Sequence, residues 1–138
     1  MAQKSFTAAV DEWVRATEQR MLAVFRTSAQ YVIDDMQDRT PVVFGFLRAS
    51  INVNTNGPEP LSRDRPDGVE SFPPPSYDLA ILGAELGDTI YATFTANYGA
   101  HVEYGANGRT GRGMVRLAAQ AWPSHVGRAV AEAKQRVG

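Results

Sequence analysis

The chain has 138 residues, about the size of a single domain, so the sequence predicts one domain over 1–138 with no room for a separate catalytic domain. Fourteen lysines and arginines against fifteen aspartates and glutamates give a net charge of -1, which argues against binding nucleic acid or an anionic membrane through overall charge. The chain has two histidines and no cysteine, which excludes disulfides, thiolate nucleophiles and sulfur-ligated zinc.

A long amphipathic helix is predicted over residues 6–36. Its apolar and small residues recur every three or four positions, namely Phe6, Val10, Val14, Thr17, Met21, Val24, Phe25, Ser28, Tyr31, Val32 and Met36. Ser5 or Thr7 can cap its start, and Thr40 before Pro41 favours its end. At about 1.5 Å per residue the helix is on the order of 45 Å long, more than a domain of this size needs for its own core. We expect part of it to pack against a neighbouring molecule.

The middle of the chain is predicted to form a small antiparallel sheet. The segment 41–50 is predicted to belong to this sheet, and apolar and polar residues alternate over 51–55, 77–81 and 90–96 as in half-buried strands. The side chains expected to face the helices are Ile51, Val53, Ile90 and Phe94. 

The segment 57–76 interrupts the sheet. It holds six prolines and almost no apolar residues, a composition that suits neither a helix nor a strand. Loops of this length are usually functional or disordered. We expect an extended loop that becomes ordered only on assembly with other subunits.

The end of the chain is predicted to contain a short turn or helix over 98–104, a flexible glycine-rich loop over 105–113 and a final helix from Met114. The apolar face of that helix comprises Met114, Leu117, Ala118, Ala121, Trp122, Val126, Ala129, Val130, Ala133 and Val137. Pro123 within the pattern predicts a kink after Ala121. The predicted fold class is α+β, with a long N-terminal helix and a kinked C-terminal helix packed on a small antiparallel β-sheet, and with a long proline-rich loop.

His101 and Glu103 have the H-x-E spacing that supplies a metal ligand and a general acid or base in zinc deaminases. Those enzymes also need a downstream pair of cysteines, which this chain lacks. A small metal-dependent hydrolase built on this pair is one alternative. We expect instead no enzyme, no catalytic residue, no cofactor and no metal site, with Tyr98, Val102 and Tyr104 packing inward from this turn.

Arg109, Arg112 and Arg116 form a small basic cluster in the glycine-rich loop and at the start of the last helix. Such a cluster can contact phosphates without reading base sequence, so a local DNA-binding module is a second alternative. Arginines in a glycine loop are more often solvated or paired with carboxylates of a neighbouring subunit. The loop matches neither the Walker pattern nor the dinucleotide-binding pattern.

No membrane partner is expected. Residues 1–6 lack the basic and apolar run of a signal peptide, and no stretch approaches the roughly 20 apolar residues that span a bilayer. These features predict a protein that is made and assembled in a cytoplasm.

Two stretches resemble a known family. One is Thr40-Pro41 followed by Gly45-Phe46-Leu47-Arg48-Ala49-Ser50, and the other is Gly87-Asp88 followed by Asn97-Tyr98-Gly99-Ala100 and Val102-Glu103-Tyr104-Gly105. With the order of the helices, they are similar to the head-tail connector and tail-completion (neck) proteins of long-tailed bacteriophages. The resemblance covers most of the chain except 57–76, and Gly99 departs from the family pattern, in which alanine directly follows the tyrosine.

The resemblance implies a structural virion protein that forms a ring, of six subunits in this family, in the neck or at the head-proximal end of the tail. Its partners would be further copies of itself, the tail tube and the connector or stopper proteins, and it would be located in the virion and, during assembly, in the host cytoplasm. We expect Arg109, Arg112 and Arg116 either to contact genomic DNA in the channel without reading its sequence or to contact a neighbouring subunit. The roles of tail terminator, completion factor and stopper all fit these motifs.

Overall fold

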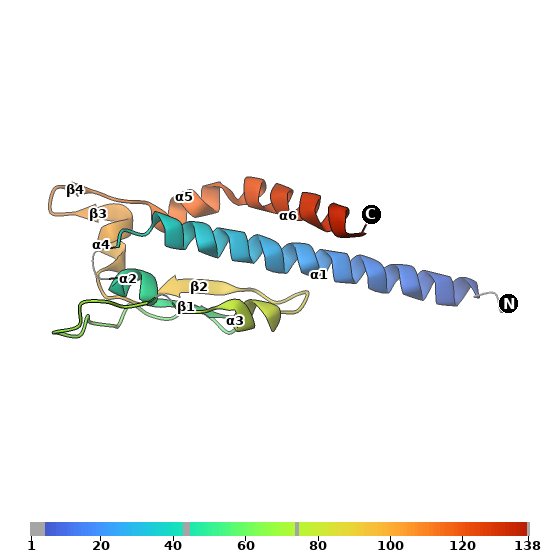
Figure 1. Cartoon of the computed structure of the whole chain (residues 1–138), viewed down its shortest axis with the longest axis horizontal. Helices are drawn as coiled ribbons and strands as arrows, with labels where there is room; N and C mark the ends of the chain where they lie inside the picture. Colours follow the sequence, from blue (N-terminus) through green and yellow to red (C-terminus); the bar gives the residue numbers. More distant parts are fainter. Residues whose placement is uncertain (1–4, 43–44, 74, 138) are drawn as a thin grey trace.

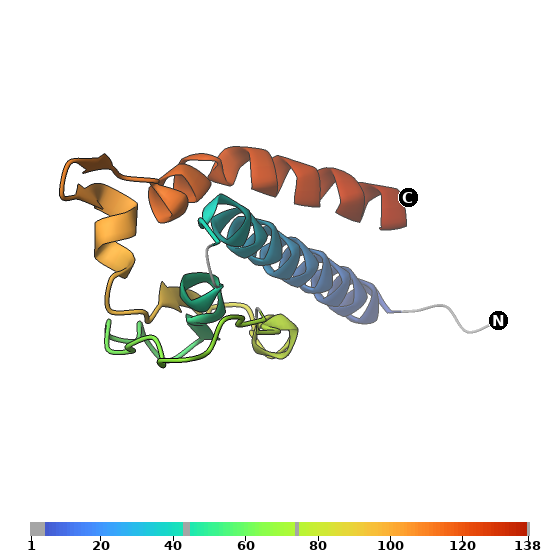
Figure 2. The same cartoon turned by 60° about the vertical axis from the view of Figure 1, so that its left-hand side comes forward.

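One helix runs through the whole molecule. The structure, a computed structural model, describes residues 5–42, 45–73 and 75–137. Helix α1 (Phe6–Arg39) spans 34 residues, and Figures 1 and 2 show the last two helices on one side of it and the strands of residues 51–54 and 91–94 on the other. The α+β class predicted from the sequence is confirmed.

Both ends of α1 lie at residues that the sequence predicted, and each end carries a side-chain hydrogen bond. The Ser5 hydroxyl oxygen accepts the backbone N–H of Ala8 at 3.1 Å. At the other end Thr40, which Pro41 biases away from the helical conformation, leaves the helix as predicted, and its hydroxyl donates to the Met36 carbonyl at 2.6 Å. The helix therefore extends to Arg39, past Met36 where the apolar pattern ends.

The sheet consists of two antiparallel strands, β1 (Ile51–Asn54) and β2 (Tyr91–Phe94). Ile51 lies directly opposite Phe94, and both side chains are buried. The backbone N–H of Thr95 donates to the Ser50 carbonyl at 3.0 Å and extends the pairing by one bond. The predicted inward-facing set is confirmed, since Val53 and Ile90 pack against the same core.

The prediction that 41–50 belongs to the sheet is wrong for its second half. Helix α2 (Phe46–Ala49) lies there, and it follows Gly45, whose φ of 86° is left-handed. A Cβ atom at Gly45 would come within 2.6 Å of the Phe72 carbonyl oxygen, so this turn requires glycine. Val43 and Phe44, which also belonged to the prediction, lie outside the described residues.

The predicted strand over 77–81 is also wrong, because helix α3 (Asp78–Leu82) occupies it. Tyr77 and Ile81 are four residues apart and both pack against the core, as two positions on one helical face do. Leu79, between them, is 85% exposed. An alternation over only five residues fits a strand or a single helical turn equally well, and here the contacts with the core favour the helix.

The described residues of the proline-rich loop over 57–76 contain no helix and no strand beyond one isolated β-bridge, between Arg63 and Ala96. The lack of a helix or an extended strand was predicted. The loop is nevertheless anchored within its own chain. The backbone N–H groups of Ser62 and Arg63 both donate to the Thr95 carbonyl, at 3.0 and 2.9 Å. The Phe72 ring lies 5.2 Å from the Phe46 ring between centroids. The loop therefore contacts the rest of the chain at two points, directly after the strand of residues 91–94 and at α2, which its composition did not predict.

The kink predicted in the C-terminal helix is confirmed. Helix α5 (Met114–Gln120) ends at Ala121, and α6 (Trp122–Val137) begins immediately after it. Pro123 lies in the first turn of α6, where its missing backbone N–H has no partner to lose. Both helices pack along α1, with Met114, Ala118 and Ala129 buried.

The hydrophobic core lies around the C-terminal half of α1. Its members come from α1, α2, both strands, α3 and α5, and are Ile33, Met36, Phe46, Leu47, Ile51, Ile81, Phe94, Ala96, Met114 and Ala118. No helix within the described part of the chain is long and apolar enough to cross a membrane.

Phe94→Ala should lower the free energy of unfolding by about 3 to 5 kcal/mol, because it leaves a cavity between the sheet and the helices. Leu79→Ala, at an exposed position of α3, is the control and should change it by less than about 0.5 kcal/mol. Urea denaturation measures both. A loss below about 1 kcal/mol for Phe94→Ala would contradict the strand register described here.

Asp35 joins α1 to α6 and should make the stability depend on pH. Burial raises the pKa of Asp35, but hydrogen bonds from His125 and Arg39 outweigh it and hold that pKa below its ordinary value. A carboxyl group with a lowered folded-state pKa stabilises the fold above its unfolded pKa of about 3.9, and this contribution is lost as the pH falls through the folded pKa.

Asp35→Asn should therefore lower the free energy of unfolding at pH 7, and the deficit should shrink below about pH 4. Asp38→Asn removes the same charge from an exposed position of α1 and serves as the control. Urea denaturation at a series of pH values measures the difference. A deficit of constant size across the series would show that the ionisation of Asp35 contributes nothing.

Candidate functional site

The two members of the H-x-E pair lie in different surroundings in α4 (Gly99–Tyr104). His101 is exposed, whereas Glu103 is 8% exposed. The Glu103 carboxylate accepts the backbone N–H groups of Val115 and Arg116, at 2.8 and 2.9 Å. These groups belong to the first turn of α5, where a helix leaves its N–H groups unpaired and favours negative charge. Glu103 therefore caps α5 from a different helix.

The expectation that Tyr104 packs inward is wrong, since this side chain is 78% exposed. Tyr98 and Val102 do pack against the core, as expected. Glu103 takes the inward position at the end of α4 because the unpaired N–H groups of α5 require an acceptor there. A sequence pattern does not reveal this, because the capping residue and the capped helix belong to different elements.

The glycine-rich segment after α4, which the sequence predicted to be a flexible loop, forms a β-hairpin. Strand β3 (Gly105–Ala106) pairs with β4 (Arg109–Thr110) in an antiparallel arrangement. Asn107 and Gly108 between them both have positive φ, 52° and 77°, as a tight two-residue hairpin turn requires. A Cβ atom at Gly105 would lie 2.5 Å from the Arg109 carbonyl oxygen, so the two strands of the hairpin approach too closely for any residue other than glycine at this position.

The three arginines of the predicted basic cluster lie along one connection. Arg109 is on β4, Arg112 lies at the exit of the hairpin, and Arg116 is in the first turn of α5. All three are exposed. The backbone N–H of Arg112 donates to the Val102 carbonyl at 2.7 Å, so the backbone from which these side chains project is held against α4. Among the described residues, no group of three or more histidines, aspartates or glutamates comes together to hold a metal ion.

No described segment of the chain covers a row of apolar side chains on α1. Figure 1 shows the N-terminal part of α1 extending beyond the end of α6. Phe6 is 85% and Trp13 67% exposed, and Val10 and Val14 on the same face are also exposed. We call Phe6, Val10, Trp13 and Val14 the α1 stripe. Clustered apolar exposure of this kind marks an interaction site rather than ordinary surface.

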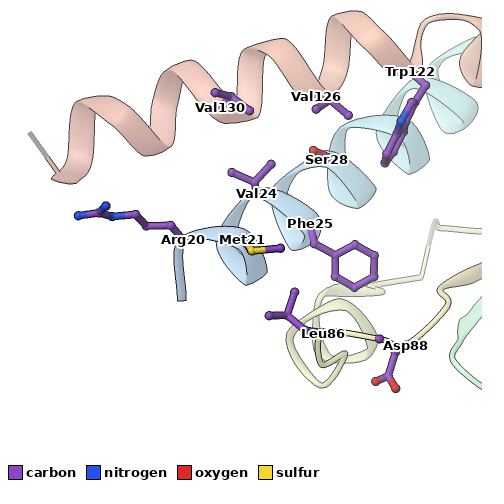
Figure 3. A pocket seen from close by; sticks show the side chains of 11 residues that line it. Arg20, Met21, Val24, Phe25, Ser28, Leu86, Asp88, Trp122, Val126 and Val130 are labelled. Carbon is purple, nitrogen blue, oxygen red and sulfur yellow. The ribbon is translucent and has the colours of Figure 1, made fainter. Parts of the chain in front are cut away.

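An apolar groove of about 600 Å³ lies further along α1, between α1, α6 and the turn that joins α3 to β2. Figure 3 shows side chains from all three segments around one space. Its apolar lining consists of Met21, Val24 and Phe25 from α1, Leu86 from the turn, and Trp122, Val126 and Val130 from α6. The turn is held to α1 by Arg26, whose Nε donates to the Ala84 carbonyl at 3.0 Å.

The sequence predicted the α1 stripe but not the groove. The stripe follows from helical periodicity and from a helix longer than its core needs. The groove needs three segments that are far apart in sequence, and the only local signal was Leu86, an apolar residue between Glu85 and the turn residues Gly87 and Asp88. 

The chain matches no protein-family model, and comparisons with curated proteins and with solved structures find no similar protein. 

Glu103→Ala should lower the free energy of unfolding by about 2 kcal/mol, because two N–H groups of α5 lose their acceptor. Glu103→Gln keeps one acceptor oxygen and should cost less. His101→Gln, at the exposed member of the pair, is the control and should change stability by less than about 0.5 kcal/mol. Urea denaturation provides the measurement. Equal effects of Glu103→Ala and His101→Gln would contradict the capping role.

Proposed function

We propose that this chain is a structural subunit of a phage or phage-like particle, where it forms a ring in the neck or at the head-proximal end of the tail and joins the tail to the capsid connector. The α1 stripe carries this proposal. A subunit that leaves a phenylalanine and a tryptophan exposed on a projecting helix is incomplete as a monomer. Repeated contacts between identical subunits are the commonest way for a soluble protein to cover such a surface.

Covering the α1 stripe would contribute enough free energy to stabilise a contact between subunits. Covering one large apolar side chain contributes about 1.5 to 3 kcal/mol. Phe6 and Trp13 are both more than half exposed, and two valines accompany them on the same face. None of the described segments covers these side chains, so this gain is available only through assembly.

The resemblance to tail-completion proteins supports the same function. The segment that includes Phe46 and Leu47 forms α2 and supplies buried core residues. The Gln37 side chain donates to the Arg48 carbonyl at 3.0 Å and ties α2 to α1. The second segment contains Glu103 and therefore the cap of α5. Both segments belong to the body at one end of α1, and the stripe lies at the other end.

The basic cluster fits this function better than it fits a free DNA-binding module. Arg109, Arg112 and Arg116 are exposed, but the chain as a whole has a net charge of -1, so attraction to DNA is confined to one connection. In a ring these arginines would contact DNA phosphates in the channel, or carboxylates of the next subunit. A hydrolase based on the H-x-E pair is not favoured, because both oxygens of the Glu103 carboxylate are engaged by α5.

Removing the gene from the particle-producing strain should leave filled heads and finished tails unjoined, and supplying the intact chain should restore joined particles in electron micrographs. The His101→Gln/Glu103→Gln variant should restore joining as well as the parent does, apart from a modest loss of stability. The purified chain should form closed rings, seen by native mass spectrometry and negative-stain microscopy. Joined particles in the absence of the chain, or a purified chain that stays monomeric at high micromolar concentration, would refute the proposal.

A further inference from the structure

We propose that the apolar groove between α1, α6 and the α3–β2 turn is the docking site for the α1 stripe of a second copy of this chain. Each subunit would insert its projecting helix end into the groove of the next. The inference rests on the proposed function of ring formation, and it identifies the contact that holds neighbouring subunits together.

The stripe cannot fill the groove of its own chain. Met21, Val24 and Phe25 of the groove and the stripe residues belong to the same continuous helix. Trp13 and Phe25 are about 18 Å apart along that helix at 1.5 Å per residue. The helix contains no proline or glycine at which it could bend sharply. The occupant must therefore come from another molecule, and an identical copy presents a matching apolar surface.

The groove and the stripe match in chemistry. The groove is lined mainly by aliphatic and aromatic side chains, and its volume of about 600 Å³ lies within the range of sites that take several apolar groups. Figure 3 shows Met21, Leu86 and Val130 around the space that a tryptophan or phenylalanine ring would enter. A helix that lays its apolar face into a groove of this kind is a common mode of recognition.

The surrounding charges are complementary. Residues 6–18 of α1 carry Asp11, Glu12 and Glu18 against a single arginine, Arg15, whereas the next arginine, Arg20, lines the groove together with Asp88. Helix α6, which forms one wall of the groove, carries Arg128, Lys134 and Arg136 against a single carboxylate, Glu132. Opposite charges beside an apolar contact guide the association and fix its register.

The area is adequate for a stable contact once repeated around a ring. Phe and Trp side chains each bury about 150 to 250 Å² when covered, so Phe6 and Trp13 together supply on the order of 300 Å² of the roughly 800 Å² per partner in a standard interface. The valines of the stripe and the charged residues beside it add to this area. Each subunit makes the contact twice, once through its stripe and once through its groove.

The stripe and the groove are different surfaces, so their contact can repeat head to tail around a closed ring, which is the arrangement proposed here. Two copies could also make the same contact reciprocally about a two-fold axis, so a parent that stops at a dimer would overturn the head-to-tail arrangement. Pairing of two stripes with each other would instead be a symmetric contact and would stop at a dimer. Stripe-to-groove and stripe-to-stripe contacts predict different outcomes when a variant with a disabled stripe is mixed with a variant with a blocked groove.

The test uses two full-length variants. Trp13→Glu disables the stripe and keeps the groove, and Leu86→Glu blocks the groove and keeps the stripe. Each variant alone should be monomeric by native mass spectrometry, under conditions in which the parent forms rings. An equimolar mixture should form 1:1 heterodimers that do not grow, because one intact groove meets one intact stripe. If circular dichroism shows that Leu86→Glu does not fold, Trp122→Glu takes its place as the groove variant, because Trp122 is a partly exposed residue of the groove lining.

Matched controls carry the same new charge elsewhere. Gln19→Glu lies on the face of α1 opposite the stripe, and Leu79→Glu lies on α3 outside the groove lining, so both should assemble as the parent does. If the parent forms rings but the mixed variants stay monomeric, the docking proposal fails while the ring proposal stands. If Trp13→Glu alone still forms rings, or if Leu79→Glu disrupts them as much as Leu86→Glu, the docking proposal also fails. A monomeric parent would overturn both proposals.

Discussion

Because α1 has no proline or glycine between Phe6 and Arg39, it is a straight rod whose two halves cannot fold onto each other. Its C-terminal half is the surface on which the core forms, with Ile33 and Met36 among the most buried side chains. Its first turns, from Phe6 to Val14, have no such cover among the described residues. The arrangement of α5, α6, α3 and the strands β1 and β2 follows from the C-terminal half, and the proposed need for a partner follows from the N-terminal turns.

Sequence patterns predicted the helices correctly where the helix was long, or where its end or kink lay at a capping residue or a proline. Ser5, Thr40 and Pro123 marked the ends and the kink of the long helices correctly. It failed over short segments. Over 77–81 the alternation described a helical turn as well as a strand, and the deciding contacts lie in the core, outside any local pattern. Over 105–113 the local signal was present in Asn107-Gly108, which favours a two-residue hairpin turn, but the number of glycines suggested a loop instead.

The same limit applies to the candidate site. The excess length of α1 could be recognised from its amphipathic pattern alone, so the stripe was within reach of the sequence. The roles of Glu103 and Leu86 were not, because each depends on a neighbour more than ten residues away or on another element altogether. Glu103 illustrates this most clearly: its spacing from His101 resembled part of a metal site, whereas its carboxylate is bound by the N–H groups of Val115 and Arg116.

The placement of the stripe and the groove on one rod has a consequence for how such subunits can diverge. Inserting one residue between Val14 and Met21 would rotate the stripe by about 100° relative to the groove and advance it by about 1.5 Å. Inserting seven restores the facing direction to within about 20° and advances the stripe by about 10 Å. Eleven residues restore it equally well. In the proposed ring, only insertions close to a whole number of helical turns would keep the stripe facing the groove, so the ring diameters should form a discrete series.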